Sequence, residues 1–415
     1  MAAALGVLVS CGSVKSGEEV VAASRDSKVV VAYVTSWSEV MPDPQYMTHI
    51  NYAFGHVNES FNGVKIDNEE RLRQIVDLRK QKPELKVLLS IGGWGSGRFS
   101  EMAANDEYRR AFAADCDRVV KEFALDGIDI DWEYPTSSMA NISSSPDDTE
   151  NFTLLMQDIR AAIGNEKELT LATVASARYI DFKAILPSVD FVNIMAYDMA
   201  SAPKHHSALY PSGHSGDITS DGAVTAHLKA GVPPSKLVMG MPFYGRGGDG
   251  YPSFQDYNKV GNTDTQYTEK WDEVAQVPYL ADKNDTLVFG FENPRSLAIK
   301  CQYILDKDLL GGMYWDYSGD NEQGDLRRTV AENLLGKPHK AKVLVLTERG
   351  GQHGGFTDAG LRWLAAEGVK GNFSITEINN ARNITEAYLS QFSLVIQLDF
   401  PPYTWPKEAE DRSEE

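Results

Sequence analysis

Three acidic residues alternate with apolar residues in one short segment, Asp129-Ile130-Asp131-Trp132-Glu133. Successive side chains of a β-strand point to opposite faces, so the three carboxyl groups share one face, about 6.6 Å apart along the strand. Crowding like charges on a buried face raises the pKa of at least one of them. A carboxylic acid that keeps its proton near neutral pH can donate it to a leaving group. We therefore predict that Glu133, the last of the three, is a general acid.

Two other interpretations of this acidic segment remain open. The three carboxyl groups would also suit a structural cluster, or a site for a hard metal ion. Calcium-binding loops place their acids on glycine-bearing turns rather than on an alternating apolar strand, so the metal site is the weaker of these alternatives.

Two further motifs have a chemical interpretation that we do not adopt. The stretch 245–250 fits GxGxxG after a strand, but no helical pattern follows it, which argues against a dinucleotide site. His205, His206 and His214 lie in one polar segment, which we interpret as a loop over the mouth of the active site rather than as a metal cluster. We predict no metal ion and no cofactor.

The elements that must position these residues are short apolar runs rich in β-branched side chains. Such runs are typical of strands buried on both faces of a parallel sheet. The eight predicted strands are Val29–Thr35, His49–Phe54, Val87–Ile91, Gly127–Glu133, Leu169–Val174, Phe191–Tyr197, Leu237–Pro242 and Gly312–Trp315. Apolar residues at steps of three and four predict helices over 106–125 and 149–163. Eight strands with crossovers predict an α/β fold of the (β/α)8 barrel type, with a doubly wound sheet as the alternative.

The domain organisation follows from these elements. Residues 29–336 form the predicted barrel domain, interrupted by an insertion at about 249–295 that holds one predicted strand, Thr286–Phe291. A second unit at 340–415 has the pattern of an incomplete βαβαβ parallel sheet. Its predicted elements are the strands Lys342–Thr347, Phe373–Ile378 and Leu394–Leu398 and a helix over 356–367.

The N-terminal residues 1–28 are predicted to be a signal and a polar tether. Leu8-Val9-Ser10-Cys11 resembles a bacterial lipobox, in which the chain is cut before a cysteine that is then lipidated. No Lys or Arg precedes the apolar stretch, so a frayed N-terminus is the alternative. The resemblance implies an exported bacterial protein, either secreted or held at the cell envelope or surface by a lipid anchor at Cys11.

Composition excludes several classes of function. The chain has 415 residues with 59 acidic and 40 basic side chains, a net charge of −19 that opposes binding to nucleic acid. No apolar run approaches the length of a membrane-spanning helix. Three cysteines cannot build a disulfide framework, and we expect Cys116 and Cys301 to be buried free thiols. The expected partner is neutral or cationic.

Five motifs carry a resemblance to family 18 of the glycoside hydrolases, the chitinase family. Leu125–Pro135 (LDGIDIDWEYP) resembles the DxxDxDxE signature of that family. The other four motifs are Ser90–Trp94 (SIGGW), Met195–Asp198 (MAYD), Met241–Arg246 (MPFYGR) and the tryptophan of GGMYWDYSGD, Trp315. All five occur in the order and on the strands that the family uses. The resemblance covers about 28–336 and implies a barrel enzyme.

The resemblance also implies a mechanism in which the 2-acetamido oxygen of the substrate is the nucleophile. This answers a gap in the sequence, because no second acid on another strand stands out. By resemblance, Glu133 protonates the leaving oxygen and later activates water, and Asp131 holds the acetamido N–H and offsets the positive charge of the intermediate. Asp129 shares a proton with Asp131, and Tyr197 hydrogen-bonds the acetamido group. Met195 and Asp198 line the subsite.

Aromatic platforms should line the groove, because sugars present flat C–H faces. Six aromatic residues lie at or just beyond predicted strand ends: Tyr33, Trp37, Phe54, Trp94, Tyr244 and Trp315. Arg246 belongs to the seventh-strand motif and is assigned to the same groove. Trp132 and Tyr134 are expected in the core or the wall, and Asp126, of opposite strand parity, is expected to be structural.

The function that the resemblance implies is hydrolysis of β-1,4-linked N-acetylglucosamine polymers, with retention of configuration. Chitin or related oligosaccharides are the expected partners. The alternatives are an endo-β-N-acetylglucosaminidase acting on N-glycans and a chitin-binding lectin that lacks activity. The short insertion predicts a shallow groove and endo-type cleavage. Lys342–Thr347 and 391–405 resemble the ThuA-like (trehalose-utilisation) family of the flavodoxin-like class, and we assign that unit no activity.

Overall fold

The computed structural model describes residues 28–248, 251–260, 267–336, 341–347, 354–371, 373–378, 384–389 and 392–398. The chain divides into two compact units, residues 1–336 and 337–415. Cys11 and the predicted tether, apart from its last residue Lys28, lie outside the described residues, so the lipid anchor stays a prediction. Among the described helices, none combines the length and the apolar character that a membrane crossing requires.

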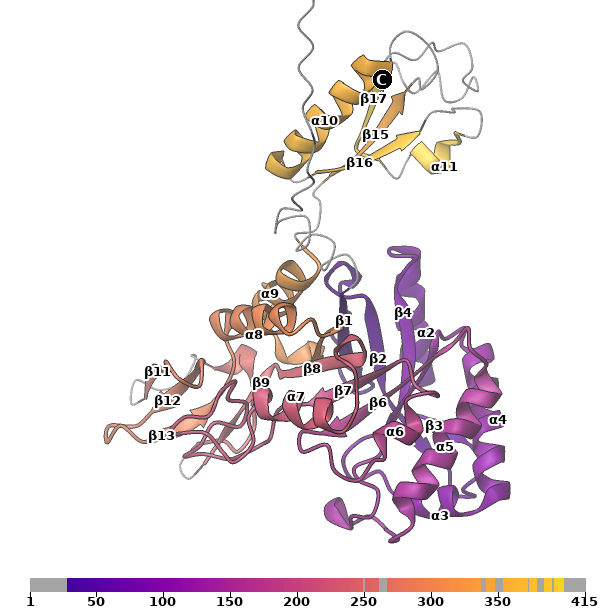
Figure 1. The fold of residues 1–415 in the computed structure, drawn as a ribbon, viewed down its shortest axis with the longest axis vertical. Coiled ribbons are helices and arrows are strands. Elements are labelled where there is room, and N and C mark those ends of the chain that lie inside the picture. The colour runs from indigo at the N-terminus through magenta and orange to yellow at the C-terminus, as the bar shows by residue number, and fades with distance from the viewer. Residues whose placement is uncertain are drawn as a thin grey trace, which may run out of the picture. The chain divides into compact units, whose positions relative to one another are not determined.

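The first unit is a closed barrel of parallel strands (Figure 1). The eight strands are β1 (Val29–Thr35), β2 (His49–Val57), β4 (Lys86–Gly92), β5 (Gly127–Asp131), β6 (Glu168–Val174), β7 (Phe191–Met195), β8 (Leu237–Pro242) and β14 (Gly311–Trp315). Their order is β1-β14-β8-β7-β6-β5-β4-β2, and pairing of β1 with β2 closes the ring. Closure confirms the predicted (β/α)8 barrel and makes the doubly wound alternative wrong.

Helices cover the outside of the barrel. They are α2 (Glu69–Val76), α3 (Phe99–Ala104), α4 (Asp106–Glu122), α5 (Asp148–Ile163), α6 (Phe182–Ile185), α7 (Ser220–Lys229), α8 (Pro294–Asp306) and α9 (Asp325–Leu334). The main core lies between these helices and the outward side chains of the strands, and a second, smaller cluster around Val31, Phe191 and Met313 fills the barrel interior. The predicted helix over 106–125 ends early, because Ala124 adopts a left-handed conformation (φ 53°).

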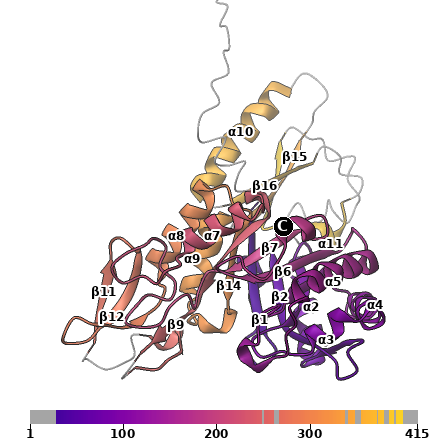
Figure 2. The same cartoon turned by 60° about the horizontal axis from the view of Figure 1, so that its bottom comes forward.

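The insertion after β8 forms an antiparallel sheet, which corrects the expectation of a single strand. Its order is β10-β9-β13-β12-β11, and the strands are β9 (Tyr244–Gly247), β10 (Gln255–Asp256), β11 (Thr268–Asp272), β12 (Val277–Ala281) and β13 (Leu287–Gly290). Strand β11 (TEKWD) lacks a buried face and therefore has no apolar alternation in its sequence. In both views this sheet lies on the side of the barrel away from α4 and α5 (Figures 1 and 2).

The strand that carries the acidic segment is shorter than predicted. Strand β5 ends at Asp131, and the backbone carbonyl of Asp131 accepts a hydrogen bond from the Gly93 N–H, 2.9 Å. Beyond that point Trp132 turns into the core, where it stacks on Phe99 at 5.3 Å. Glu133 therefore lies just past the strand, not in it. Strand β7 likewise ends at Met195, two residues before the predicted end.

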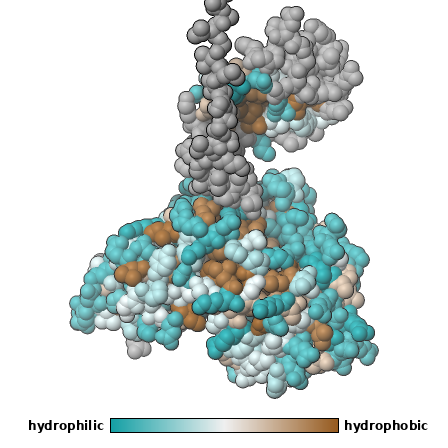
Figure 3. Space-filling view, in the orientation of Figure 1, coloured by the Kyte–Doolittle hydropathy of each residue, from teal (hydrophilic) through white to brown (hydrophobic). Residues whose placement is uncertain are grey.

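Structural roles predicted from the sequence hold for Asp126 and for two cysteines. Asp126 pairs with Arg79 and accepts the Val87 N–H at 2.7 Å, away from the barrel interior. Cys116 and Cys301 are buried and free. Hydrophilic residues cover much of the face of this unit in Figure 3, interrupted by separate apolar groups, which places many charged side chains in solvent.

The second unit has the predicted order of elements. Its strands β15 (Ala341–Thr347), β16 (Phe373–Ile378) and β17 (Leu394–Leu398) form a parallel sheet of order β16-β15-β17, with helices α10 (Gly354–Gly371) and α11 (Glu386–Leu389). Three parallel strands do not define a fold family, so the flavodoxin-like and ThuA-like assignment stays a prediction.

Candidate active site

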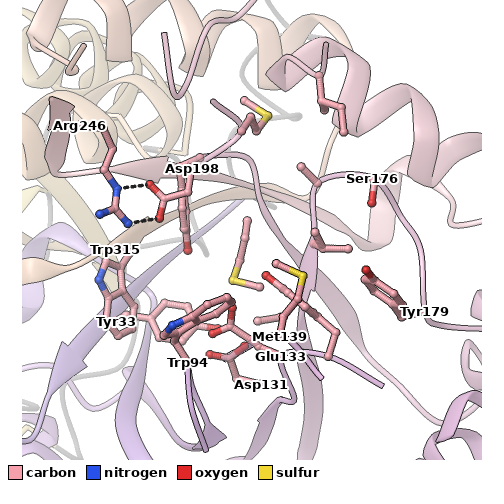
Figure 4. A pocket seen from close by; sticks show the side chains of 18 of the residues that line it. Tyr33, Trp94, Asp131, Glu133, Met139, Ser176, Tyr179, Asp198, Arg246 and Trp315 are labelled. Carbon is pink, nitrogen blue, oxygen red and sulfur yellow. Dashed lines mark hydrogen bonds and ion pairs between the residues drawn. The ribbon is translucent and has the colours of Figure 1, made fainter. Parts of the chain in front are cut away.

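A cavity of about 630 Å³ opens at the carboxyl ends of the barrel strands. It brings together all the predicted site residues except Asp129: Tyr33, Trp37, Phe54, Trp94, Asp131, Glu133, Met195, Tyr197, Asp198, Tyr244, Arg246 and Trp315. Figure 4 shows Tyr33, Trp94 and Trp315 on one side of the two central carboxyl groups and Ser176 and Tyr179 on the other. Because parallel strands end together at one rim, residues distant in sequence converge here.

Asp129 lies below the cavity, completely buried among donors from four strands. Its Oδ2 accepts hydrogen bonds from the Tyr33 hydroxyl (2.8 Å) and the Ser90 hydroxyl (2.8 Å). Its Oδ1 accepts from Thr170 (2.6 Å) and Asn193 (3.3 Å). Burial raises the pKa of Asp129, although these four hydrogen bonds act in the opposite direction. The first carboxyl group of the row is therefore a buried support.

Asp131 is 4% exposed and forms part of the cavity wall. Burial raises its pKa well above the ordinary value, and the charges of Glu133 and Asp129 raise it further. Its Oδ1 is buried and has no hydrogen-bond partner among the described residues. A buried polar atom without a partner costs free energy, so this oxygen is suited to receive a donor from a ligand.

Glu133 is half-buried, and its carboxyl group faces the cavity. Burial raises its pKa to about 7, the charge of Asp198 adds to the rise, and a hydrogen bond with Tyr134 opposes it. At neutral pH a substantial fraction of Glu133 is therefore protonated. This is the property required of a general acid.

Asp198 is held by a two-point ion pair with Arg246. Arg246 Nε and Nη2 donate to its carboxylate oxygens at 2.7 and 2.6 Å, as Figure 4 shows. The buried His206 ring lies 3.4 Å from the same carboxylate. Burial alone would raise the pKa of Asp198, but Arg246 and His206 lower it overall. Asp198 therefore stays ionised and acts electrostatically on Glu133.

The predicted aromatic residues divide into two groups. Trp315 forms the floor, with Phe54 stacked on it (5.6 Å between centroids, 21°) and Tyr33 beside it (5.6 Å). Trp37 and Trp94 are 64% and 62% exposed and stand at the rim. The first group is packed ring against ring, and the second is exposed and available for contact with a ligand.

Tyr197 and Tyr244 form the wall next to Asp198. Their rings meet edge to face, 6.1 Å apart, and the Tyr197 hydroxyl lies 3.8 Å from the Met313 sulfur. Burial raises the pKa of both hydroxyl groups, and nearby carboxylates raise it further, so both tyrosines keep their protons and can donate hydrogen bonds. Tyr134, expected in core or wall, stacks on Tyr179 in the wall.

Sequence reasoning missed part of the lining, chiefly Met139, Ser176, Arg178, Tyr179 and Phe254. Tyr179 follows β6, the fifth strand of the barrel, so its position beyond a strand end was a usable signal. Phe254 stacks on Tyr244 at 4.7 Å but comes from the insertion, where no pattern in the sequence identified it.

The histidine segment is tied into the protein rather than arranged for a metal. His205 and His206 are buried, and their partners are Asp272 and Asp198 respectively. Among the described residues, no group of three or more His, Cys, Asp or Glu side chains is placed to hold a metal ion. His206 touches a residue that lines the cavity, which agrees with its interpretation as part of a loop near the active site.

Two glycines at the end of β4, Gly92 and Gly93, allow the chain to pass close to the acidic strand. Gly92 has φ +132°, and a Cβ on it would lie 2.0 Å from the Asp131 carbonyl oxygen. Gly93 has φ +91°, and its Cβ would lie 2.7 Å from the Phe54 ring. This geometry explains why the SIGGW motif requires both glycines.

Gly92→Ala should therefore be destabilising. Backbone strain of this kind costs about 1–3 kcal/mol, and the collision with the Asp131 backbone adds to it. The free energy of unfolding, measured by denaturant titration, should fall by at least that amount. Gly95→Ala is the matched control, because Gly95 also has positive φ (+83°) but has no atom nearer than 4.0 Å to its Cβ position. Equal losses for the two variants would contradict the close-approach argument.

A (β/α)8 barrel whose rim holds a glutamic acid with a raised pKa, a buried partner carboxyl group and aromatic platforms is typical of enzymes that cleave glycosidic bonds. Comparisons with known proteins agree with this class. The sequence model of glycosyl hydrolases family 18 matches residues 29–320. The chain belongs to that family.

Individual relatives support the assignment. Chitinase A1 of Niallia circulans is 30% identical over 409 residues, covering 73% of this chain and 58% of its own length. Chitotriosidase-1 of Mus musculus is 31% identical over 350 residues, covering 71% of this chain and 74% of its own. A family 18 N-acetylglucosaminidase structure from Paenibacillus barengoltzii is 32% identical with a TM-score of 0.69, covering 74% of this chain and 100% of that one. The chain thus spans somewhat more than half the length of chitinase A1.

Proposed function

We propose that this protein hydrolyses β-1,4-linked N-acetylglucosamine polymers, as in chitin and chitooligosaccharides, with retention of configuration. The observation that carries the proposal is the pair of carboxyl groups at the end of β5, with Glu133 partly protonated and Asp131 presenting an unpartnered oxygen. Among the residues that line the cavity, the only other carboxylate is Asp198, which Arg246 neutralises. The described residues of the lining therefore offer no second carboxylate nucleophile across the cavity, which favours attack by a group of the substrate itself.

The reaction proceeds in two steps. Glu133 donates its proton to the glycosidic oxygen while the 2-acetamido oxygen attacks the anomeric carbon, which breaks the glycosidic bond and forms an oxazolinium ion. Asp131 accepts a hydrogen bond from the acetamido N–H and offsets the positive charge. The Glu133 carboxylate then takes a proton from water as that water attacks the anomeric carbon. The bond between this carbon and the acetamido oxygen breaks, which restores the acetamido group, and two inversions leave the configuration retained.

Other residues position the sugar. The Tyr197 hydroxyl donates a hydrogen bond to the acetamido oxygen, and the Trp315 ring packs against the sugar ring. Met195, Asp198 and Arg246 line the same subsite. Asp129 keeps Asp131 in place and adds to its raised pKa, and we propose that the two exchange a proton when Asp131 turns toward the substrate.

The cleavage is proposed to be endo-type. Trp37 and Trp94 are both more than half exposed at the rim, so they offer platforms to sugars of a chain that extends beyond the cavity. Export and a lipid anchor at Cys11 remain proposals, and the second unit is given no activity.

A direct substrate comparison tests the function. The protein is incubated with chitooligosaccharides and with a high-mannose glycoprotein, and products are separated by chromatography. Hydrolysis of the former supports the proposal, and release of glycan from the latter alone would favour an endo-β-N-acetylglucosaminidase. Binding of chitooligosaccharides without turnover would favour a lectin, although the presence of Glu133 argues against one. Successive disaccharides released from one chain end would contradict endo cleavage.

The pH dependence follows from the raised pKa of Glu133. The protonated form is needed for the first step, so kcat/KM should fall about tenfold per pH unit above about 7. Asp198→Asn removes the negative charge that raises this pKa and leaves Arg246 unpaired, and both changes favour ionised Glu133. The alkaline limb of the pH–rate profile should therefore move to lower pH in that variant. An unchanged limb would show that another group controls it.

A further inference from the structure

The rim tryptophan Trp94 stands on a segment that is rich in glycine, Gly92-Gly93-Trp94-Gly95-Ser96-Gly97. Its side chain is 62% exposed and makes none of the ring–ring contacts found among the described residues. Glycine-rich backbone loses more conformational entropy than any other when it is ordered. A platform on such a segment binds a sugar well only if the segment is already held in place.

A histidine from the neighbouring strand holds this segment. The Nδ1 atom of His56, in β2, lies 2.8 Å from the Ser96 hydroxyl oxygen, and its Nε2 lies 2.9 Å from Asp67 Oδ2. A carboxylate can only accept, so the ring nitrogen that faces Asp67, Nε2, carries a proton. The ring is turned the opposite way from a Ser–His–Asp nucleophile relay, in which Nε2 faces the serine.

This connection joins the Trp94 segment to the floor of the cavity. Asp67 donates its backbone N–H to the Phe54 carbonyl at 3.0 Å, and Phe54 stacks on Trp315. Gly93 packs on the Phe54 ring and donates its N–H to the Asp131 carbonyl. Gly93 therefore fixes one end of the segment against the carboxyl groups, and Ser96 fixes the other end through His56.

We propose that His56 is a positioning residue that, through Ser96, holds Trp94 as a preformed platform for a sugar of the substrate. The proposal rests on the proposed function, because the ligand is a β-linked N-acetylglucosamine chain. Loss of the hydrogen bond between His56 and Ser96 leaves the reacting groups unchanged. The entropy cost of ordering the segment then falls on substrate binding. KM should rise about 3- to 10-fold, the range for one hydrogen bond, while kcat stays as in the wild type.

The test uses Ser96→Ala, Trp94→Ala and the double variant, with Ser96→Thr as the control that keeps the hydroxyl group. Steady-state kinetics on one chitooligosaccharide long enough to fill the cavity give KM and kcat for each. Ser96→Ala should raise KM, Ser96→Thr should not, and Ser96→Ala should have no further effect once Trp94 is removed. His56→Ala should reproduce Ser96→Ala, and thermal unfolding checks that each variant is folded.

The proposal fails if Ser96→Ala leaves KM unchanged, or if its effect on KM persists in the Trp94→Ala background, as a general structural role would predict. If the wild type binds the oligosaccharide without turnover, the proposed function fails, and dissociation constants from calorimetry take the place of KM in the same comparison. A wild type that neither binds nor hydrolyses the oligosaccharide overturns both proposals.

Discussion

Glu133→Gln is expected to lower kcat on chitooligosaccharides by about 10²- to 10⁴-fold, the range for loss of a general acid. Glutamine keeps the shape and the hydrogen bonding of the protonated side chain but has no proton to give to the leaving oxygen. Substrate binding should change little, so KM should stay close to the wild-type value. The measurement is steady-state hydrolysis at a pH below 7, where wild-type Glu133 is mostly protonated.

Glu168→Gln is the matched control for this variant. Glu168 starts β6, the neighbouring strand, and pairs with His49 at 3.0 Å at the opposite end of the barrel. Replacing Glu168 should lower the stability of the protein, because the ion pair with His49 is lost, but should leave kcat unchanged. The smallest loss expected is about 10²-fold. A Glu133→Gln variant that loses less than about 10-fold in kcat would show that Glu133 is not the acid.

Asp131→Asn is expected to lower kcat by about 10²- to 10³-fold, the size of the effect when a preorganised group at a developing charge is removed. Asp131 Oδ1 has no hydrogen-bond partner among the described residues. In the proposed mechanism it accepts the acetamido N–H, and the charge of the carboxylate offsets that of the oxazolinium ion. Asparagine removes the charge, and its amide group can present a donor where an acceptor is needed. The loss should fall on kcat, because the charge develops only during the reaction.

Asp126→Asn provides the control for Asp131→Asn. Asp126 directly precedes β5 and Asp131 is the last residue of that strand, but Asp126 faces Arg79 and the Val87 N–H outside the barrel interior. Asp126→Asn should lower the temperature of unfolding without changing kcat. Asp131→Asn should lower kcat without lowering the temperature of unfolding. Comparable kcat losses in both variants would mean that distortion of the strand, rather than the charge, is responsible.

Much of the barrel and of its central carboxyl groups could be predicted from local patterns. Continuous apolar runs such as Val29–Thr35 predict buried strands, because only strands covered on both faces tolerate them. Strand alternation separates Asp129 and Asp131 from Ile130 and Trp132 without reference to any other part of the chain. The resemblance placed the SIGGW motif on the third barrel strand, and it lies at the end of β4, where Gly92 and Gly93 take backbone conformations open to few other residues.

Other features depend on contacts between distant segments and could not be predicted in this way. The insertion contains the polar strand Thr268–Asp272, which has no strand pattern in its sequence. It is defined as a strand by its pairing with Val277–Ala281. The end of β5 at Asp131 depends on the pocket between Phe99 and Phe152 that takes Trp132. The His56 tether joins three residues whose types and spacing have no distinctive pattern.

The sequence by itself therefore determined the class of fold and the row of acidic residues, and it predicted Glu133 as the acid, because these depend on side-chain types at fixed local spacing. The tertiary structure decided what each carboxyl group can do. Asp129 is a support because Tyr33, Ser90, Thr170 and Asn193 converge on it from four other strands. Glu133 has a pKa of about 7 because burial and the charge of Asp198, held by Arg246, act on it together. Electrostatic energies depend on distance and desolvation in space, and only the folded barrel sets those.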